Sequence, residues 1–224
     1  MSFKNIGDIQ NEFRWLLAEK NYSENGTLEI VNASFLAHEE SIFGSVNYEY
    51  AEAEIKWYRS KSLNVNDIPY DPIPKIWKDV ATPDGFINSN YGWCIYSKEN
   101  GEQFLNATYT LARDKYSRQA MMIYTRPDMH EAASKGGMKD FMCTNTVQLL
   151  IRNNKLHYIV NMRSNDAVFG YKNDRYWHNF VFKEALKEMR LFYKDLERGN
   201  LYWNASSLHV YPRHFNLIAE SAKL

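Results

Sequence analysis

Hydrophobic and polar positions follow a helical period in two long segments of the chain. From Tyr48 to Ser60 helix-forming residues predominate, and Tyr50, Glu54 and Trp57 fall near one face by their spacing. This pattern predicts a helix in which Glu54 faces inward beside aromatic residues. From Tyr176 to about Leu196 apolar residues recur every three or four positions, which predicts a long amphipathic helix packed on a sheet.

Other segments follow the two-residue period of strands or are continuously apolar. The two that flank Asn153-Asn154 predict a tight hairpin, because asparagine tolerates the positive φ of such a turn. Cys143 then lies just before the first strand of the hairpin, and Arg163 lies at the far end of the second. The predicted strands are residues 27–31, 120–124, 147–152, 156–162 and 207–214.

Residues 64–90 hold four of the six prolines and several Asn, Asp and Gly residues. A long loop is expected there, with one helical turn around residues 76–78. Ordered loops of this length often line a binding site. The sequence has no internal repeat, low-complexity segment or flexible linker. We therefore expect a single α+β domain over residues 1–224.

Composition and charge narrow the classes of function. With 224 residues, of which 45% are hydrophobic, the chain can bury one sizeable core. Lys plus Arg and Asp plus Glu both number 27, so the sequence offers no broad basic field for nucleic acid or an anionic membrane. We expect neither as a partner. A small anionic ligand held by a few arginines fits this balance better.

The sequence also bears on the compartment of the protein. No apolar run approaches the roughly 18 residues that cross a membrane, and the polar N-terminal residues lack the apolar core of a signal peptide. A cytoplasmic protein is expected. In a reducing compartment, Cys94 and Cys143 are thiols rather than a disulfide.

Cys143 is the candidate nucleophile. A catalytic cysteine needs a cation that lowers the thiol pKa and a group that exchanges protons, and Arg163 and Glu54 are candidates for these tasks. A small buried side chain without a catalytic role is the simpler alternative. A Cys/His hydrolase using His209 or His214 is another, but no protease-like signature surrounds Cys143.

Six motifs lie in order along the chain: residues 54–58, 87–92, 117–118, 140–148, 161–174 and 207–214. Together they resemble the thymidylate synthase superfamily, and more closely its bacteriophage branch, the deoxycytidylate (dCMP) hydroxymethylases. The resemblance covers residues 33–215. It implies an α+β fold with a mixed β-sheet and packed helices, and a two-fold homodimer formed through the sheet.

The resemblance implies covalent chemistry on a pyrimidine. Cys143 would add to C6 of the base, which makes C5 able to attack a one-carbon unit. The donor would be the co-substrate 5,10-methylenetetrahydrofolate, and no metal is implied. Addition of water would give 5-hydroxymethyl-dCMP and tetrahydrofolate. A hydride in place of water would give the methyl product and dihydrofolate.

Asp174 stands where thymidylate synthases carry an asparagine that faces the base. Cytosine presents an N3 acceptor and an amino donor, and a carboxyl group can meet both, whereas an amide suits uracil. Asp174 is therefore expected to select dCMP. Without the motif it would be interpreted as a surface residue of a turn. Glu54 is expected to organise water and move protons. The alternative interpretation is that Glu54 is a solvent-facing helix residue without a catalytic role.

The resemblance also assigns residues that bind the two substrates. A guanidinium and a hydroxyl suit a phosphate dianion, and Arg118 is expected to reach the phosphate site of the partner subunit. A lone tryptophan is more often a core residue, so Trp77 has that alternative. The expected nucleotide-binding residues are Arg118, Arg163, Ser164, Gln148, Tyr91, His209 and Tyr211, and the expected folate-binding residues are Asp166 and Trp77.

Other functions stay open at this point. A dCMP C5-methyltransferase would give a methyl product, and a dUMP hydroxymethylase or a thymidylate synthase would use the other base. A degenerate homologue that serves as an RNA-binding or assembly module is the non-enzymatic alternative. Neutral charge and the presence of both Cys143 and Glu54 weigh against it. If the protein is encoded by a phage, the host cytoplasm is its expected location.

Overall fold

The computed structural model describes residues 4–133 and 136–221. The chain forms two compact units: the first comprises Met1–Val46 and Ile151–Leu224, and the second comprises Asn47–Leu150. The boundary falls within strand β3 (Thr144–Arg152). The expectation of a single domain stays a prediction.

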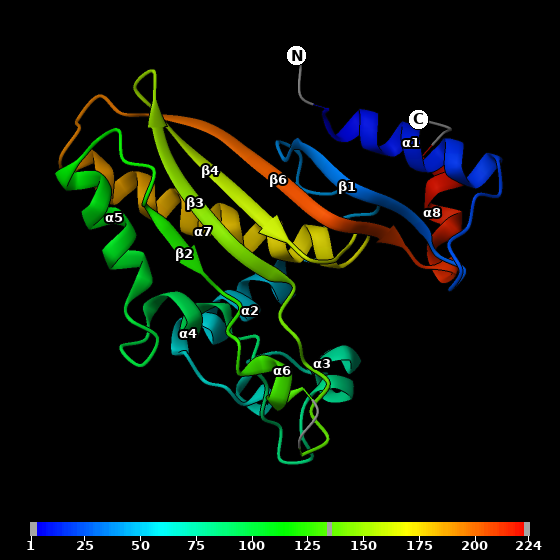
Figure 1. Cartoon of the computed structure of the whole chain (residues 1–224). Coiled ribbons are helices and arrows are strands. Elements are labelled where there is room, and N and C mark those ends of the chain that lie inside the picture. The colour runs from blue at the N-terminus through cyan, green and yellow to red at the C-terminus, as the bar shows by residue number, and fades with distance from the viewer. Residues whose placement is uncertain (1–3, 134–135, 222–224) are drawn as a thin grey trace. The chain divides into compact units, whose positions relative to one another are not determined.

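The first unit is built on a mixed sheet around strand β6 (Glu197–Val210). β6 pairs antiparallel with β1 (Leu28–Leu36) and parallel with β4 (Lys155–Met162) (Figure 1). It also pairs parallel with the two-residue strand β5 (Asn165–Asp166). The predicted mixed sheet is thus confirmed. The parallel pairs bring the ends of β4 and β5 beside the C-terminal half of β6, where several predicted site residues lie.

Helices cover and flank this sheet. The long helix α7 (Gly170–Arg190) packs on β4, β5 and β6 through a face that includes buried Trp177 and Phe182. Helix α1 (Ile6–Ala18) begins with a capping box between Asn5 and Asp8, which satisfies backbone N–H groups of its first turn. α1 lies beside the short helix α8 (Phe215–Glu220), which follows the 3-10 turn η2 (Pro212–His214) (Figure 1).

The long helix is displaced along the sequence from its predicted position. The prediction placed it at residues 176–196, but it begins at Gly170 and ends at Arg190, so both limits were wrong. Asp166 accepts the backbone N–H of Val168 at 2.9 Å just before the helix, and the buried face of the helix already includes Tyr171, ahead of the predicted start. Leu196 lies in a turn that follows the helix, and its side chain is buried. The apolar spacing therefore continues beyond the end of the helix.

The strands of the first unit are also longer than predicted. Residues 27–31 belong to a strand that continues to Leu36, and residues 207–210 are the last part of the 14-residue β6. The strand ends at Val210 rather than at residue 214, because Pro212 has no N–H for a ladder and begins η2 instead. Between β3 and β4, Asn153 and Asn154 have φ of 50° and 56°, which confirms the predicted tight turn.

The second unit is mainly helical. Helix α2 (Tyr48–Ser60) has the predicted limits, and α3 (Lys75–Val80) is the predicted helical turn. Helix α4 (Tyr91–Tyr96) packs so closely on α2 that a Cβ at Gly92 would lie 1.9 Å from the carbonyl oxygen of Tyr58. Only glycine fits at that crossing.

The remaining elements of the second unit include helix α5 (Gln103–Arg113), which the sequence analysis did not predict. Strand β2 (Met121–Ile123) pairs antiparallel with β3, and Met121 lies opposite Gln148. The predicted strand at 120–124 is therefore confirmed with a shorter span. The short elements η1 (Val65–Asp67) and α6 (Met129–Ala132) complete the unit.

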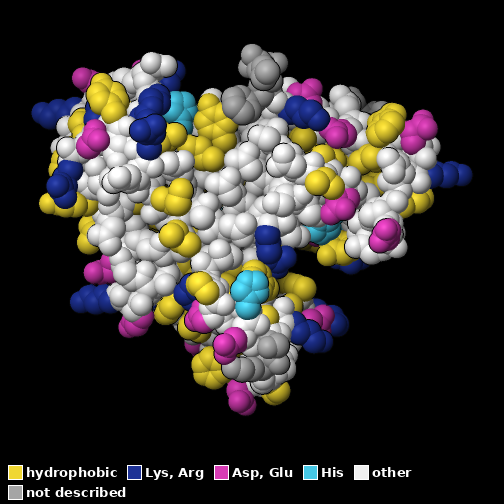
Figure 2. Space-filling model, in the orientation of Figure 1, with side chains coloured by type: hydrophobic (Ala, Val, Ile, Leu, Met, Phe, Trp, Pro, Cys, Tyr) yellow, Lys and Arg dark blue, Asp and Glu magenta, His cyan; other side chains and the backbone are white. Residues whose placement is uncertain are grey.

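Two features of the structure concern a membrane or a nucleic acid as a partner: the character of the helices and the distribution of surface charge. Among the described residues, no helix combines the length and the apolar character that crossing a membrane requires. On the face drawn in Figure 2, basic and acidic side chains are interspersed, as the equal numbers of the two charges suggest.

Candidate active site

Glu54 lies on the inner face of α2, as predicted, and is only 6% exposed. The hydroxyl of Tyr50, one helical turn earlier, donates to Glu54 Oε1 at 2.5 Å. The indole N–H of Trp77 on α3 donates to the same Tyr50 hydroxyl at 2.8 Å. Trp77 also meets Trp57 edge to face, with ring centroids 5.1 Å apart. Two predicted site residues, Glu54 and Trp77, are therefore brought together through Tyr50.

Burial raises the pKa of Glu54 to about 7, because the charged form loses its hydration. The hydrogen bond from Tyr50 and the indole of Trp77 act in the opposite direction by favouring the carboxylate. A carboxyl group that titrates near neutral pH can both take and give a proton under working conditions. Glu54 thus has the property that an acid–base residue needs.

Cys143 is half-buried and directly precedes β3, as predicted. Three residues earlier, Asp140 is buried and accepts the backbone N–H groups of Asn88 and Ser89, each at 2.7 Å. The hydroxyl of Ser89 donates to the other carboxylate oxygen at 2.6 Å. Asp140 therefore ties the segment that carries Cys143 to the loop that leads into α4.

Tyr91 is the first residue of α4 and is buried in an aromatic stack. Its ring stacks on Tyr58 at 5.2 Å and meets Tyr124 edge to face at 5.4 Å. Because Asn90 caps the helix by accepting the N–H of Trp93 at 2.7 Å, the position of Tyr91 is fixed by both backbone and ring contacts.

Gln148 and Arg118 are also close to one another. Gln148 lies on β3, and its amide nitrogen donates to the backbone carbonyl of Arg118 at 2.7 Å. The residue Arg118 itself is exposed in the loop before β2. An exposed arginine on a loop anchored in this way is available to a second molecule.

The other cysteine has a different environment. Cys94 is fully buried on α4, with its sulfur 3.8 Å from Met142 Sδ and 3.7 Å from Arg126 Nη1. Burial raises the pKa of the Cys94 thiol to about 12, although the charge of Arg126 opposes the shift. Neither cysteine is disulfide-bonded, which agrees with the expectation.

Asp174 lies in the second turn of α7, not in a surface turn. Its Oδ2 accepts the side-chain amide of Asn165 at 2.8 Å. A Cβ at Gly170 would lie 3.1 Å from Asn165 Nδ2 and 3.3 Å from Asp166 Cβ, so a larger residue there would crowd β5 against the helix start. The hydrogen bond from Asn165 therefore helps to orient the Asp174 carboxylate.

Asp166 and His209 lie opposite each other where β5 pairs with β6. Burial lowers the pKa of His209, and the nearby carboxylate of Asp166 partly offsets this effect. The positive charge of Arg163 lowers the same pKa further. These three predicted site residues are thus within electrostatic range of one another.

Tyr211 follows the end of β6, and its ring meets His209 edge to face at 5.0 Å. These two predicted site residues are therefore in contact. Arg163 and Ser164 occupy the turn between β4 and β5, where Arg163 is exposed. A guanidinium, a hydroxyl, an imidazole and a phenol are accordingly presented near the ends of neighbouring strands.

The predicted site residues form two groups, one in each unit. The first unit holds Asp174, Arg163, Ser164, His209, Tyr211 and Asp166, and the second holds Cys143, Glu54, Arg118, Gln148, Tyr91 and Trp77. The residues that the sequence analysis missed, Tyr50 and Asn165, hold members of these groups. Both adjoin predicted site motifs, but only the folded contacts reveal their partners.

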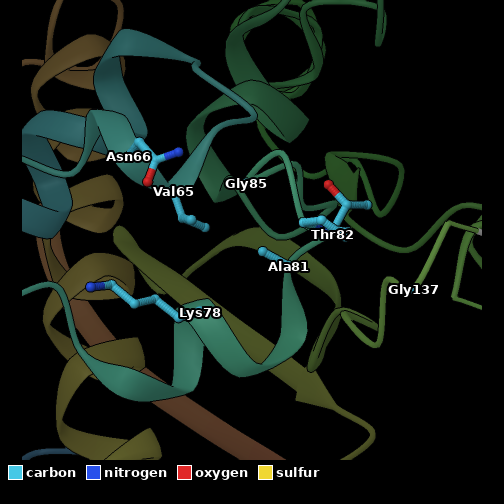
Figure 3. A pocket seen from close by; sticks show the side chains of 8 residues that line it. Val65, Asn66, Lys78, Ala81, Thr82, Gly85 and Gly137 are labelled. Atoms are coloured by element: carbon cyan, nitrogen blue, oxygen red, sulfur yellow. The ribbon is translucent and has the colours of Figure 1, made fainter.

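A cavity of about 460 Å³ lies elsewhere in the second unit (Figure 3). None of the predicted site residues lines it. Among the described residues, no cluster of three or more His, Cys, Asp or Glu side chains is placed to bind a metal ion. The cavity is lined by Val65, Asn66, Lys78, Ala81, Thr82, Pro83, Gly85 and Gly137.

Comparison with known proteins shows the family and the fold. Residues 44–223 match the model of the family described as thymidylate synthase. In the solved structure of thermostable thymidylate synthase A from Bacillus subtilis, the fold is similar, with a TM-score of 0.68 and 20% identity. That match covers 98% of this chain and 84% of the other.

Individual sequences give a sharper comparison. The chain is 49% identical over 194 residues to deoxycytidylate 5-hydroxymethyltransferase of Enterobacteria phage T4, covering 86% of this chain and 78% of the phage protein. The corresponding protein of phage T2 matches to the same extent. Thymidylate synthase 1 of Bacillus subtilis is 29% identical over 178 residues, covering 76% of this chain and 60% of that protein.

Proposed function

The chain belongs to the thymidylate synthase family, and from this premise we propose that it converts dCMP to 5-hydroxymethyl-dCMP. The reaction transfers a one-carbon unit from 5,10-methylenetetrahydrofolate to C5, adds water, and releases tetrahydrofolate. The observation that carries the proposal is the carboxylate of Asp174, which accepts a hydrogen bond from Asn165 at 2.8 Å and is proposed to read the base. The likeness to phage enzymes named for this reaction supports it.

Asp174 accounts for the choice of base. The carboxylate accepts from the exocyclic amino group of cytosine, and in its protonated form it also donates to N3. Uracil presents a donor at N3 and an acceptor at C4, so a carboxylate would oppose the C4 oxygen of uracil. The hydrogen bond from Asn165 occupies Oδ2 and limits rotation of the carboxylate.

Cys143 is the proposed nucleophile. Its sulfur bonds to C6 of the pyrimidine, the electron pair moves to C5, and C5 bonds to the one-carbon unit. When the C5 proton leaves, the bond between the one-carbon unit and the folate nitrogen breaks, and tetrahydrofolate departs. Water adds to the exocyclic methylene that remains on the ring, and the bond between sulfur and C6 then breaks, which regenerates the thiol. The half-buried position of Cys143 before β3 allows access that the buried Cys94 lacks.

Glu54 is the proposed acid–base residue. Its pKa of about 7 means that both protonation states are populated near neutral pH, which suits a group that takes a proton in one step and gives it in another. The surrounding aromatic side chains keep the carboxyl group buried, and this burial is the cause of the raised pKa.

The co-substrate supplies carbon at the oxidation level of formaldehyde. The residues present fit such a ligand, because Trp77 offers a half-buried aromatic surface. Asp166 retains acceptor capacity beyond its bond from Val168. Arg163 and Ser164 are proposed to bind the phosphate, and His209 and Tyr211 the deoxyribose. Gln148 and Tyr91 are proposed to line the nucleotide site.

The proposed assembly is a homodimer in which Arg118 reaches the phosphate site of the partner subunit. The exposure of Arg118 on its anchored loop supports this role. By analogy with the phage relatives, the expected location is the cytoplasm of an infected host cell.

Mass spectrometry of the product tests the proposed function. Incubation with dCMP and methylenetetrahydrofolate should add one CH2O unit to the nucleotide, and Cys143→Ser should abolish the gain because a hydroxyl is a much weaker nucleophile. A gain of CH2 with formation of dihydrofolate would instead identify a dCMP methyltransferase. Conversion of dUMP in place of dCMP would contradict the role given to Asp174.

A further inference from the structure

The hydrogen bonds around Glu54 have a fixed direction. An indole nitrogen can only donate, so the Tyr50 oxygen must accept from Trp77. The hydroxyl hydrogen of Tyr50 is then directed to its other partner, Glu54 Oε1. The order of donation is therefore Trp77 to Tyr50 to Glu54. A hydroxyl held between these two partners cannot reverse its role without losing a bond.

We propose that Tyr50 is a positioning residue that occupies Oε1 of Glu54 and so assigns the exchangeable proton of this carboxyl group to Oε2. Oε1 already accepts a short hydrogen bond from Tyr50. A proton bound to the same oxygen would be close to the Tyr50 hydroxyl hydrogen, so Oε1 is disfavoured as the site of protonation. The proton that Glu54 takes up or releases is thus carried on one defined oxygen. The inference rests on the proposed acid–base role of Glu54.

The packing around Tyr50 holds this geometry. Tyr50 is 7% exposed, and its ring meets Tyr70 edge to face at 5.2 Å. The hydroxyl of Tyr70 accepts the amide of Asn47 at 3.1 Å and is engaged away from Glu54. Rotation of the Tyr50 ring would break both the contact with Tyr70 and the bond to Trp77.

Other titratable groups on α2, α3 and α4 have partners of their own. The phenols of Tyr58 on α2 and Tyr91 on α4 stack on each other. Lys75 and Asp79 of α3 pair with each other at 2.6 Å on the exposed side of the helix. The pKa of Glu54 responds to burial, to Tyr50 and to Trp77.

The test compares Tyr50→Phe with Tyr70→Phe in the full-length protein. Each change removes one hydroxyl and keeps the ring, but only the first removes a donor to Glu54. The side-chain carboxyl carbons of glutamate are labelled with ¹³C, and the Glu54 signal is identified by its loss in Glu54→Gln. Because the Tyr50 bond favours the carboxylate, its loss should raise the pKa of Glu54 by about 1 unit.

Activity provides the second measurement. In Tyr50→Phe the limb of the kcat/KM profile that reports Glu54 should move to higher pH by the same amount. At the wild-type optimum kcat should fall by about 10-fold, with little change in KM for dCMP. Tyr70→Phe should keep the wild-type pH profile.

The two measurements separate failure of this inference from failure of the proposed function. An unchanged Glu54 titration in Tyr50→Phe, or an equal shift in Tyr70→Phe, would overturn the role of Tyr50. Trp77→Phe should raise the pKa of Glu54 by a smaller amount, and a fall would also contradict the inference. Absence of dCMP conversion by the wild-type protein would reject the proposed function, while the titration would still decide whether Tyr50 holds Glu54.

Discussion

At the scale of single residues, Asp174 is the side chain that we propose selects the base. It projects from the second turn of α7 and is held by a hydrogen bond from Asn165. Such a bond requires only an acceptor oxygen, which both a carboxylate and an amide provide. The contact can therefore survive a change of side chain that alters how the base is read.

Asp174→Asn is expected to change the preferred base without disturbing the fold. The amide would donate where cytosine also donates, so kcat/KM for dCMP should fall by about 100-fold or more while conversion of dUMP becomes measurable. Chromatography of both nucleotides after incubation with methylenetetrahydrofolate checks this. Asn173→Ala, one position earlier on α7, is the control and should keep the preference for dCMP. An unchanged preference in Asp174→Asn would show that another residue reads the base.

At the scale of elements, Asp140 joins two segments by bonds to residues 52 and 51 positions earlier in the sequence. It accepts two backbone N–H groups and one hydroxyl from residues 88 and 89, just before α4. These bonds constrain both the entry to the helix that begins with Tyr91 and the approach of the chain to Cys143. Buried carboxylates with several donors are strongly held, because each bond is charge-assisted.

Asp140→Asn should destabilise the protein by roughly 2–3 kcal/mol, because an amide N–H would face one of the donors now bound. The free energy of unfolding in urea measures the loss. Asp128→Asn is the matched control, since Asp128 is 74% exposed and its 3.4 Å ion pair with Arg126 contributes little at the surface. Equal losses in the two variants would mean that the bonds to residues 88 and 89 are not the source of the stability.

Some elements of the fold could be predicted from the sequence, and others could not. Helix α2 and the Asn153-Asn154 turn were predicted correctly because their signals are local: one apolar face, and two residues that tolerate positive φ. The limits of α7 were wrong, because its buried face begins at Tyr171, before the predicted start, and Leu196 is buried beyond its end. Local spacing cannot reveal either effect.

The candidate site, like the fold, could be predicted only in part from the sequence. Motifs supplied the positions of Cys143, Glu54 and Asp174, but not the partners that orient them. Tyr50 lies within the predicted helix and Asn165 within a predicted motif, yet their hydrogen bonds depend on folded geometry. The roles of the twelve predicted site residues in binding and catalysis stay predictions.

At the scale of the whole molecule, the proposed dimer makes each active site depend on both chains. If Arg118 serves the partner, a chain lacking Cys143 and a chain lacking Arg118 together contain one intact site. Isologous dimers assemble such chains at random when the two are produced together.

Coexpressed Cys143→Ala and Arg118→Ala chains should therefore recover about a quarter of wild-type activity, since half of the dimers are mixed and each has one intact site. Each variant produced alone should be nearly inactive, and dCMP conversion measures all three preparations. A Gln119→Ala chain, altered at the exposed neighbour of Arg118, is the control and should be active alone. No recovery in the mixture would place Arg118 in its own subunit's site or outside the site.

The burial of Cys94 has a practical consequence for the study of this protein. A thiol whose pKa is about 12 stays protonated and unreactive at neutral pH, and it is also closed to reagents by the packing of α4. The folded chain therefore presents Cys143 alone to alkylating probes. One natural cysteine can serve as a built-in label, and the count of modified thiols per chain then reports the fraction of molecules with an accessible site.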